Sequence, residues 1–263
     1  MDFGIRGRTA LVFGGSKGLG RGTADALAAE GVDVALVARG QDALDQAAGE
    51  IAARHGVAAH GFAADLADHD AVLRAVDRAE AALGGRVDVL VNNTGGPPPT
   101  GAAGVAPALW AAQFHTMVLS VFRVTDRLLP GMRARGWGRV LTIASTTVIE
   151  PNPALGMSNT LRSALAGWSK TLAGEVARDG VTVNMILPGL VATDRTTFLD
   201  GSAAERQGTT PGAVRAAREA GIPVGRYGTP EEFGAVGAFL ASERASFVTG
   251  SMIRVDGGAV RSV

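Results

Sequence analysis

Residues 9–20 read TALVFGGSKGLG, and this stretch decides the fold. The first five residues form a short apolar run typical of a buried strand, and an alanine-rich segment with helical periodicity begins near residue 19. Between them, Gly14, Gly18 and Gly20 allow a tight turn and a close approach of the backbone to a phosphate group. A helix that begins at such a turn presents free amide groups to an anion. The stretch therefore predicts a strand, a phosphate-binding turn and a helix, the opening of a dinucleotide-binding unit.

The same alternation of strand and helix continues along the chain. Further strand-like runs lie at 32–38, 57–63, 87–91, 139–144, 181–187 and 252–255. Helix-like segments lie at 19–30, 41–55, 68–83, 109–135, 155–178 and 230–240. Strands too apolar to alternate are buried on both faces, and short connections between parallel strands require right-handed crossovers. We therefore expect one α/β domain over 1–263, a Rossmann-type doubly wound parallel sheet of about seven strands with helices on both faces.

One segment, roughly 193–222, departs from this alternation. It follows a strand, is weakly helical in pattern and is long for a plain connection, which makes it a candidate substrate lid. A surface insertion without a role is the alternative. The helix after it has a clear start, because Thr229 is a good N-cap, Pro230 suits the first helical position and Glu232 completes a capping box.

Composition narrows the possible partners. The 263 residues include 25 basic and 25 acidic side chains, so the charge distribution expected for binding nucleic acid or an anionic membrane is missing. There is no cysteine and there are four histidines, which leaves little material for a metal site, and we expect none. Asp2, Arg6 and Arg8 interrupt the first apolar residues, so we expect no secretory signal and a cytoplasmic location.

Further motifs follow the other strands. Asn92-Asn93-Thr94-Gly95 comes after the fourth strand, Pro188-Gly189 with Thr193 comes after the sixth, and Val255-Asp256-Gly257-Gly258 closes the sequence. Together with the G-x-x-x-G-x-G spacing of residues 14–20, these motifs resemble the short-chain dehydrogenase/reductase family over essentially the whole chain. The resemblance implies a small-molecule substrate, a homodimer or homotetramer, and a nicotinamide dinucleotide. It assigns the cofactor to Gly14, Ser16, Lys17, Gly18, Leu19, Gly20, Asp65, Leu66, Asn92, Thr94, Gly95, Pro188, Gly189 and Thr193.

The residues at the end of the second strand favour NADP over NAD. An NAD enzyme needs a carboxylate there to accept hydrogen bonds from the ribose 2′-hydroxyl, and Ala38 occupies that place. Arg39 follows and is suited to a 2′-phosphate, and Lys17 adds a second positive charge from the glycine turn. Each of these basic residues taken alone also fits a solvated surface charge.

Three of the four catalytic positions that the resemblance implies are changed. Ser145 matches the family's serine, but Ser158 stands where its tyrosine belongs and Arg162 replaces the lysine four residues later. Met117 occupies the place of its asparagine. The sequence S-N-x-x-R from Ser158 to Arg162 resembles a divergent subgroup labelled, by similarity, as oxoacyl-carrier-protein reductases.

These changes alter the expected chemistry. A serine hydroxyl is far less acidic than a phenol, so Ser158 cannot act as the proton donor in the way a tyrosine does. Ser145 and Ser158 remain able to hydrogen-bond a carbonyl oxygen while water supplies the proton, and Arg162 keeps a positive charge for positioning the cofactor. A lining serine without a chemical role is the alternative for Ser158.

Other ionisable residues are weaker candidates. Glu150 lies in the loop that borders the substrate in this family, so a desolvated carboxyl there is a candidate acid or base. His115 lies near the changed asparagine position, but its helical spacing points it elsewhere. Tyr227 is the single tyrosine and lies in a different segment. The remaining histidines fall in polar turns, and we expect them on the surface: His55, His60 and His69.

Three functions are compatible with this pattern. The first is an NADP-dependent oxidoreductase that interconverts a carbonyl and an alcohol with an atypical active site. The second is a non-redox enzyme on the same scaffold, namely a dehydratase, isomerase or lyase. The third is a nucleotide-binding pseudoenzyme. Fold alone does not choose among them, and the substrate is not legible from the sequence.

Overall fold

The sheet predicted from the apolar runs is present in the computed structural model, which describes residues 2–262. Its strands, all parallel, lie in the order β3-β2-β1-β4-β5-β6-β7. They are β1 Thr9–Phe13, β2 Asp33–Ala38, β3 Ala59–Ala63, β4 Val89–Asn92, β5 Gly138–Ile143, β6 Val181–Pro188 and β7 Met252–Val255. Most residues of β1, β2, β4, β5 and β6 are buried, as expected for strands covered on both faces. The prediction of a Rossmann-type α/β fold is confirmed.

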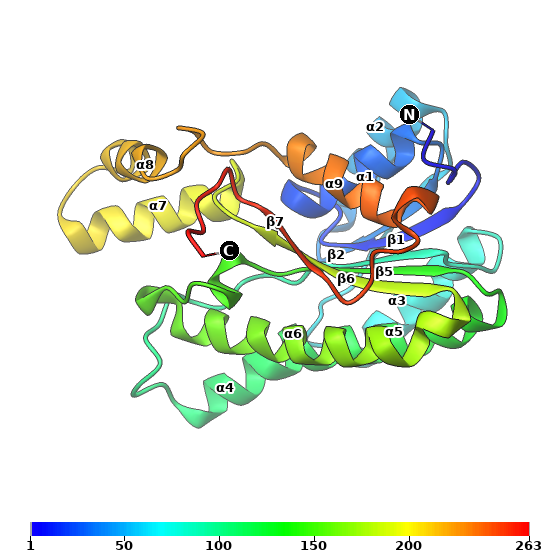
Figure 1. Cartoon of the computed structure of the whole chain (residues 1–263), viewed down its shortest axis with the longest axis horizontal. Helices are drawn as coiled ribbons and strands as arrows, with labels where there is room; N and C mark the ends of the chain where they lie inside the picture. The colour runs from blue at the N-terminus through cyan, green and yellow to red at the C-terminus, as the bar shows by residue number, and fades with distance from the viewer. Residues whose placement is uncertain (1, 263) are drawn as a thin grey trace.

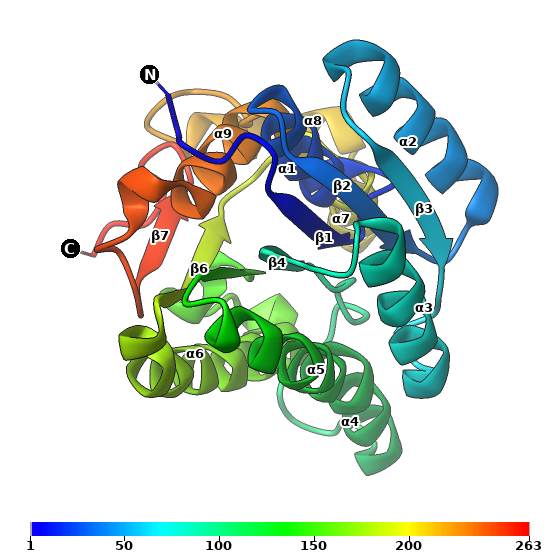
Figure 2. The same cartoon turned by 90° about the vertical axis from the view of Figure 1, so that its right-hand side faces the viewer.

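Helices cover both faces of the sheet (Figures 1 and 2). One layer holds α1 Gly18–Ala29, α2 Gln41–His55 and α9 Pro230–Ala241. The opposite layer holds α3 His69–Ala82, α4 Pro107–Phe114, α5 Ser120–Ala134 and α6 Gly156–Val176. An apolar cluster fills the space between the sheet and each layer. The sheet is therefore a rigid support for the loops at the ends of its strands.

The helices α1 and α9 pack against each other unusually closely. A Cβ atom on Gly22 would overlap the carbonyl group of Pro230, and one on Gly234 would overlap the carbonyl group of Gly22. The start of α9 carries the predicted capping box, in which Thr229 and Glu232 bond each other's backbone amides. This contact holds α1, and with it the glycine turn, firmly on the sheet.

The structure corrects two expectations about helices. The segment 109–135 is not one regular helix, because a π-helical turn, His115–Leu119, separates α4 from α5. The segment 193–222 is not weakly helical, because it forms α7 Asp194–Gln207 and α8 Pro211–Ala220. Both helices extend from the carboxyl end of β6, at the left of Figure 1. Within residues 2–262, no helix combines the length and the apolar character needed to cross a bilayer.

Candidate active site

The motifs identified in the sequence meet at one edge of the sheet. The strands β1, β4, β5 and β6 are neighbours and run in parallel, so their carboxyl ends lie side by side. The glycine turn follows β1, residues 93–101 follow β4, Ser145 follows β5 and Pro188-Gly189 ends β6. Ligands of open α/β sheets bind outside the carboxyl ends of the strands, close to where the strand order reverses. That reversal lies here between β1 and β4.

The glycine turn forms a cradle for an anion. Gly14 and Gly18 have φ values of +62° and +60°, a left-handed backbone conformation that residues with a side chain rarely adopt. A Cβ atom on Gly20 would overlap the carbonyl oxygen of Gly14. The helix α1 begins without a side-chain cap, because Lys17 at its N-cap position makes no capping bond. The first amides of α1 are thus available to a pyrophosphate.

The polar residue that ends β4 and the two that follow it have different environments. The side-chain amide of Asn92 donates to the Thr125 hydroxyl over 3.2 Å, so it ties β4 to α5. The side chain of Asn93 lies against Gly14 and Gly20 and supports the glycine turn. The hydroxyl of Thr94 is buried and has no hydrogen-bond partner among residues 2–262. A buried hydroxyl without a partner is costly, so Thr94 is a candidate to hydrogen-bond a ligand at this end of the sheet.

The start of α7 lies beside the glycine turn. Thr193, its N-cap, accepts a hydrogen bond from the Thr196 amide, and its methyl group lies near Gly18. Lys17 Nζ lies 2.6 Å from Asp194 Oδ2 on the exposed surface, and this hydrogen bond lowers the pKa of Asp194. Lys17 therefore spans from the turn to α7. Arg39 is exposed and has no salt-bridge partner within the described range 2–262.

The remaining residues expected to contact the cofactor surround this turn. Asp65 is exposed and accepts the Ala67 amide over 2.9 Å, and Leu66 packs partly against the core. Leu19 also packs partly against the core, Ser16 is half-buried, and Gly95 is exposed. Pro188 ends β6, and the amide of Gly189 donates to the carbonyl of Val255.

Arg162 connects Ser158 to the end of β5. Its Nε donates to Ser158 Oγ over 3.3 Å, and its Nη1 donates to the carbonyl of Ile143 over 3.1 Å. Arg162 is 9% exposed, and burial, with a smaller contribution from the charge of Arg195, lowers its pKa to about 10. The guanidinium is therefore still charged at neutral pH. Ser145, two residues beyond Ile143, is half-buried and accepts the Thr147 amide.

Two other changed or candidate positions lie apart from these contacts. Met117 is 1% exposed and belongs to an apolar cluster under the site, where it packs as a core residue in the π-helical turn. Glu150 is exposed, and its carboxylate accepts the amide of Arg261 over 2.8 Å. Within residues 2–262, no hydrogen bond or salt bridge joins Glu150 to Ser145 or Arg162.

The expectation that the histidines lie on the surface is wrong for His69. His69 is 6% exposed and stacks on His115, with ring centroids 3.6 Å apart, because the start of α3 packs against the π-helical turn. Its Nε2 bonds the carbonyl oxygen of His115 over 3.0 Å. Burial lowers the pKa of His69. His55, which is half-buried, bonds Asp25, and His60 is half-buried in β3.

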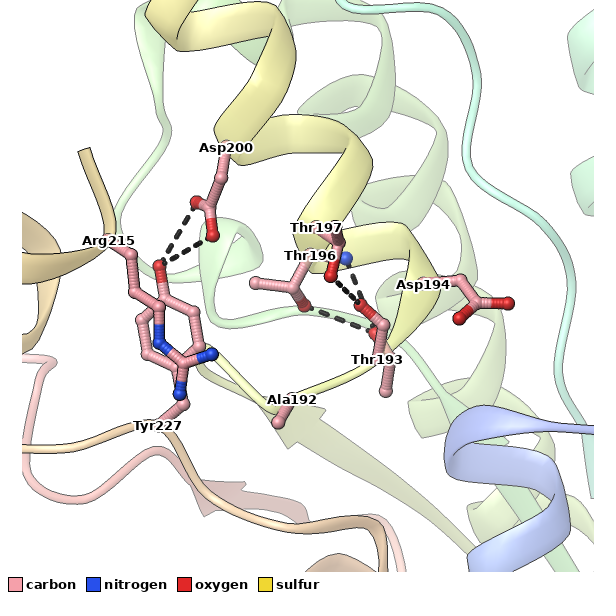
Figure 3. A pocket seen from close by; sticks show the side chains of 8 residues that line it. All are labelled: Ala192, Thr193, Asp194, Thr196, Thr197, Asp200, Arg215 and Tyr227. Carbon is pink, nitrogen blue, oxygen red and sulfur yellow. Dashed lines mark hydrogen bonds between the residues drawn. The ribbon is translucent and has the colours of Figure 1, made fainter. Parts of the chain in front are cut away.

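Figure 3 shows a pocket of about 240 Å³ beside α7. The Tyr227 hydroxyl donates to Asp200, Arg215 lies 4.9 Å from the centre of the tyrosine ring, and Arg218 pairs with the same carboxylate. The pocket is lined by Ala192, Thr193, Asp194, Thr196, Thr197, Asp200, Arg215 and Tyr227. Ser145, Ser158 and Arg162 are not part of it. Tyr227 thus fastens α7 and α8 to the body of the protein and is not positioned for the chemistry at Ser145.

Sequence reasoning missed Arg195, in the first turn of α7. Its Nη2 donates to the carbonyl of Pro97 over 2.9 Å, and it packs against Gly96, where a Cβ atom would lie 2.7 Å from Nη2. Arg195 follows Thr193 by two residues, yet its role depends on a contact 98 positions away in the chain. No local signal in the sequence indicates that contact.

Comparisons with known proteins agree over nearly the full chain. A family model described as enoyl-(acyl carrier protein) reductase matches residues 14–260. The 3-oxoacyl-[acyl-carrier-protein] reductase of Aquifex aeolicus is 31% identical over 98% of this chain and 99% of the relative. The D-beta-hydroxybutyrate dehydrogenase of Cupriavidus necator is 34% identical over 97% of this chain and 99% of its own. The crystal structure of L-sorbose reductase from Gluconobacter frateurii, complexed with NADPH and L-sorbose, has a TM-score of 0.93 at 33% identity, covering 100% of both chains.

Proposed function

Because the chain belongs to the short-chain dehydrogenase/reductase family of oxidoreductases, we propose that it interconverts a carbonyl and an alcohol with NADP and an atypical active site. The observation that carries this proposal is the intact glycine cradle at the same sheet edge as Ser145 and the buried pair of Ser158 and Arg162. A scaffold that had lost its cofactor would have no reason to keep this glycine turn beside an unpartnered buried hydroxyl.

The residues present fit NADP. The uncapped amides of α1 suit the pyrophosphate, and the unpartnered hydroxyl of Thr94 suits a polar group of the dinucleotide. Arg39 is free for a 2′-phosphate, whereas Lys17 reaches it only by leaving Asp194. The NADPH bound to the L-sorbose reductase supports the same choice. NAD fits this site less well than NADP, because Ala38 offers no acceptor for a 2′-hydroxyl.

The catalytic chemistry follows from the hydrogen bond between Arg162 and Ser158. When bound in this cradle, NADPH would supply the hydride for the carbonyl carbon. Ser158 Oγ accepts a hydrogen bond from the charged Arg162. This bond polarises the Ser158 hydroxyl, which can then donate to the substrate oxygen. Ser145 supplies a second donor, and the oxygen takes its proton from water, relayed through Ser158. Arg162 stays protonated and stabilises the developing negative charge. Glu150 enters this scheme only if its carboxylate leaves the Arg261 amide.

The helices α7 and α8 are the candidate lid over 193–222. Lys17 and Arg195 join α7 to the two loops that border the site, and Tyr227 fastens the other side. A lid held by few polar contacts is suited to open for substrate exchange. The single domain over 1–263 and a homodimer or homotetramer complete the proposal.

A titration of the protein with NADPH and with NADH, followed by fluorescence, tests the cofactor assignment. We expect tighter binding of NADPH, and a loss of about tenfold in Arg39→Ala, since a charged hydrogen bond contributes about 1.5–3 kcal/mol. Arg178→Ala is the matched control, because Arg178 is an exposed arginine at the opposite edge of the sheet, just before β6. Equal affinity for both nucleotides, unchanged in Arg39→Ala, would contradict the proposal.

One observation favours the non-redox alternative. The single tyrosine, Tyr227, is bonded to Asp200, so no phenol stands beside Ser145. The double substitution Ser158→Tyr with Arg162→Lys separates the two functions. A gain in carbonyl reduction shows that the rest of the site supports redox chemistry, whereas bound NADPH without any gain favours a dehydratase, isomerase or lyase.

A further inference from the structure

Arg162 is a buried cation without an acidic partner. Its guanidinium bonds a hydroxyl and a backbone carbonyl, both neutral, and no carboxylate within residues 2–262 lies at salt-bridge distance from it. Burying a charge costs several kcal/mol unless an opposite charge or a full set of hydrogen bonds compensates it. The other deeply buried arginine, Arg139, has Glu243 at 3.7 Å. Arg162 lacks such compensation.

A second arginine of the same kind lies close by. Arg195 is half-buried, and no acidic side chain among residues 2–262 pairs with it, since the adjacent Asp194 pairs with Lys17. Its hydrogen-bond partner among residues 2–262 is the neutral carbonyl of Pro97, which leaves most of its N–H groups free. Burial lowers the pKa of Arg195, and its charge in turn acts on Arg162. Arg162 contacts the end of β5 and Arg195 contacts the loop after the neighbouring strand β4, so an anion that reached both would be attracted by two charges whose partners are neutral.

The cofactor's own anionic groups are accounted for elsewhere. The glycine cradle after β1 suits the pyrophosphate, and Arg39 after β2 suits the 2′-phosphate. Arg195 instead contacts the loop after β4, at Gly96 and Pro97, and Arg162 contacts the end of β5. The anion that this pair lacks therefore belongs to the substrate side of the site.

We propose that the substrate carries a carboxylate that binds Arg195 and Arg162, which makes it an oxo acid or the corresponding hydroxy acid. This inference rests on the proposed function and names its substrate class. The ring of Phe198 lies 5.5 Å from the Arg195 guanidinium carbon and covers one side of it, so the N–H groups at its edge remain to grip a carboxylate with two bonds.

Matched acids and esters test this substrate class. Pyruvate, acetoacetate and 4-oxopentanoate are each compared with their methyl esters in NADPH oxidation. We expect kcat/KM to favour at least one acid over its ester by about tenfold or more. In Arg195→Ala that preference disappears, mainly through a higher KM, and Arg195→Lys restores part of it. Arg206→Ala, an exposed arginine on the same helix, keeps the preference.

A binding experiment decides the question without turnover. The thermal midpoint of the complex with NADP⁺ is measured with each acid and each ester. Stabilisation by an acid but not its ester, lost in Arg195→Ala while the Kd for NADPH stays within about twofold, supports the carboxylate site. Equal effects of acids and esters in both experiments overturn it. So does a loss of NADPH affinity in Arg195→Ala, which would assign this arginine to the cofactor. Failure of the wild-type protein to bind NADPH refutes the proposed function instead.

Discussion

Replacing Arg162 by methionine separates a functional arginine from a structural one. Burial lowers the pKa of this guanidinium from its ordinary value to about 10, so keeping it charged costs the folded state about 3 kcal/mol, at about 1.4 kcal/mol for each tenfold change in acidity. The folded state binds its proton less tightly than the unfolded chain, so this cost is fully present below about pH 10 and is relieved as the pH rises further.

Arg162→Met removes that cost together with two hydrogen bonds, to Ser158 and to the Ile143 carbonyl. Each bond from this charged group contributes about 1.5–3 kcal/mol, so the relieved cost offsets much of their loss, and methionine fills similar space with an apolar chain. We therefore expect the free energy of unfolding at pH 7.5 to fall by less than about 3 kcal/mol, while carbonyl reduction is lost.

Urea unfolding followed by circular dichroism measures this difference, and Arg139→Met is the matched control. Arg139 is also buried, but it bonds Gly138 and Ser242 and has Glu243 nearby. Removing one partner from such a network typically costs about 3–5 kcal/mol. A comparable loss in Arg162→Met would refute the reasoning, because it would show that the charge of Arg162 stabilises the fold.

Three further substitutions test the glycine turn, the candidate lid and the loss of stability at acid pH. Gly20→Ala places a Cβ atom on the carbonyl oxygen of Gly14, so we expect NADPH binding to vanish in the fluorescence titration; retained affinity would show that the turn adapts. Tyr227→Phe removes the hydroxyl that bonds Asp200, which should destabilise the lid by about 1 kcal/mol and speed tryptic cleavage within 193–222, with cleavage elsewhere as the internal control. Hydrogen bonding lowers the pKa of Glu232 from 4.5 to about 2, so its stabilisation is present above pH 4.5 and is lost as the pH falls toward 2. In Glu232→Gln, the acid-induced drop in Tm over that range should be smaller, and an unchanged drop would contradict the assignment.

The fold was predictable because its signals are local. Each strand is a short apolar run between turn residues, and the glycines near Gly14 announce both the turn and the helix after it. The cap at Thr229 is also readable from three neighbouring residues. The π-helical turn is not, because nothing in His115–Leu119 differs from an ordinary helix until α3 packs beside it. The same contact buries His69, which local polarity had placed on the surface.

The candidate site was predictable only in part, and for a related reason. The cofactor cradle is a property of backbone conformation, which glycine spacing reports directly. The positions of Ser145, Ser158 and Arg162 followed from spacing along the chain, and their hydrogen bonds appear only in the fold. No motif spacing along the chain points to Arg195. Its contact with Pro97 depends on α7 lying over the loop after β4.

The uncompensated charge of the site explains why its chemistry is hard to read from sequence. A scaffold selected for stability alone would pair Arg162 with a carboxylate or replace it with an apolar side chain. Here Arg162 contacts the end of β5 and Arg195 contacts the loop after the neighbouring strand β4, and the hydrogen-bond partners of both are neutral. The uncompensated charge destabilises the site and attracts an anion that enters, because the low-dielectric surroundings strengthen both effects. Since Arg195 supplies one of these charges, affinity for a carboxylate should fall in Arg195→Ala.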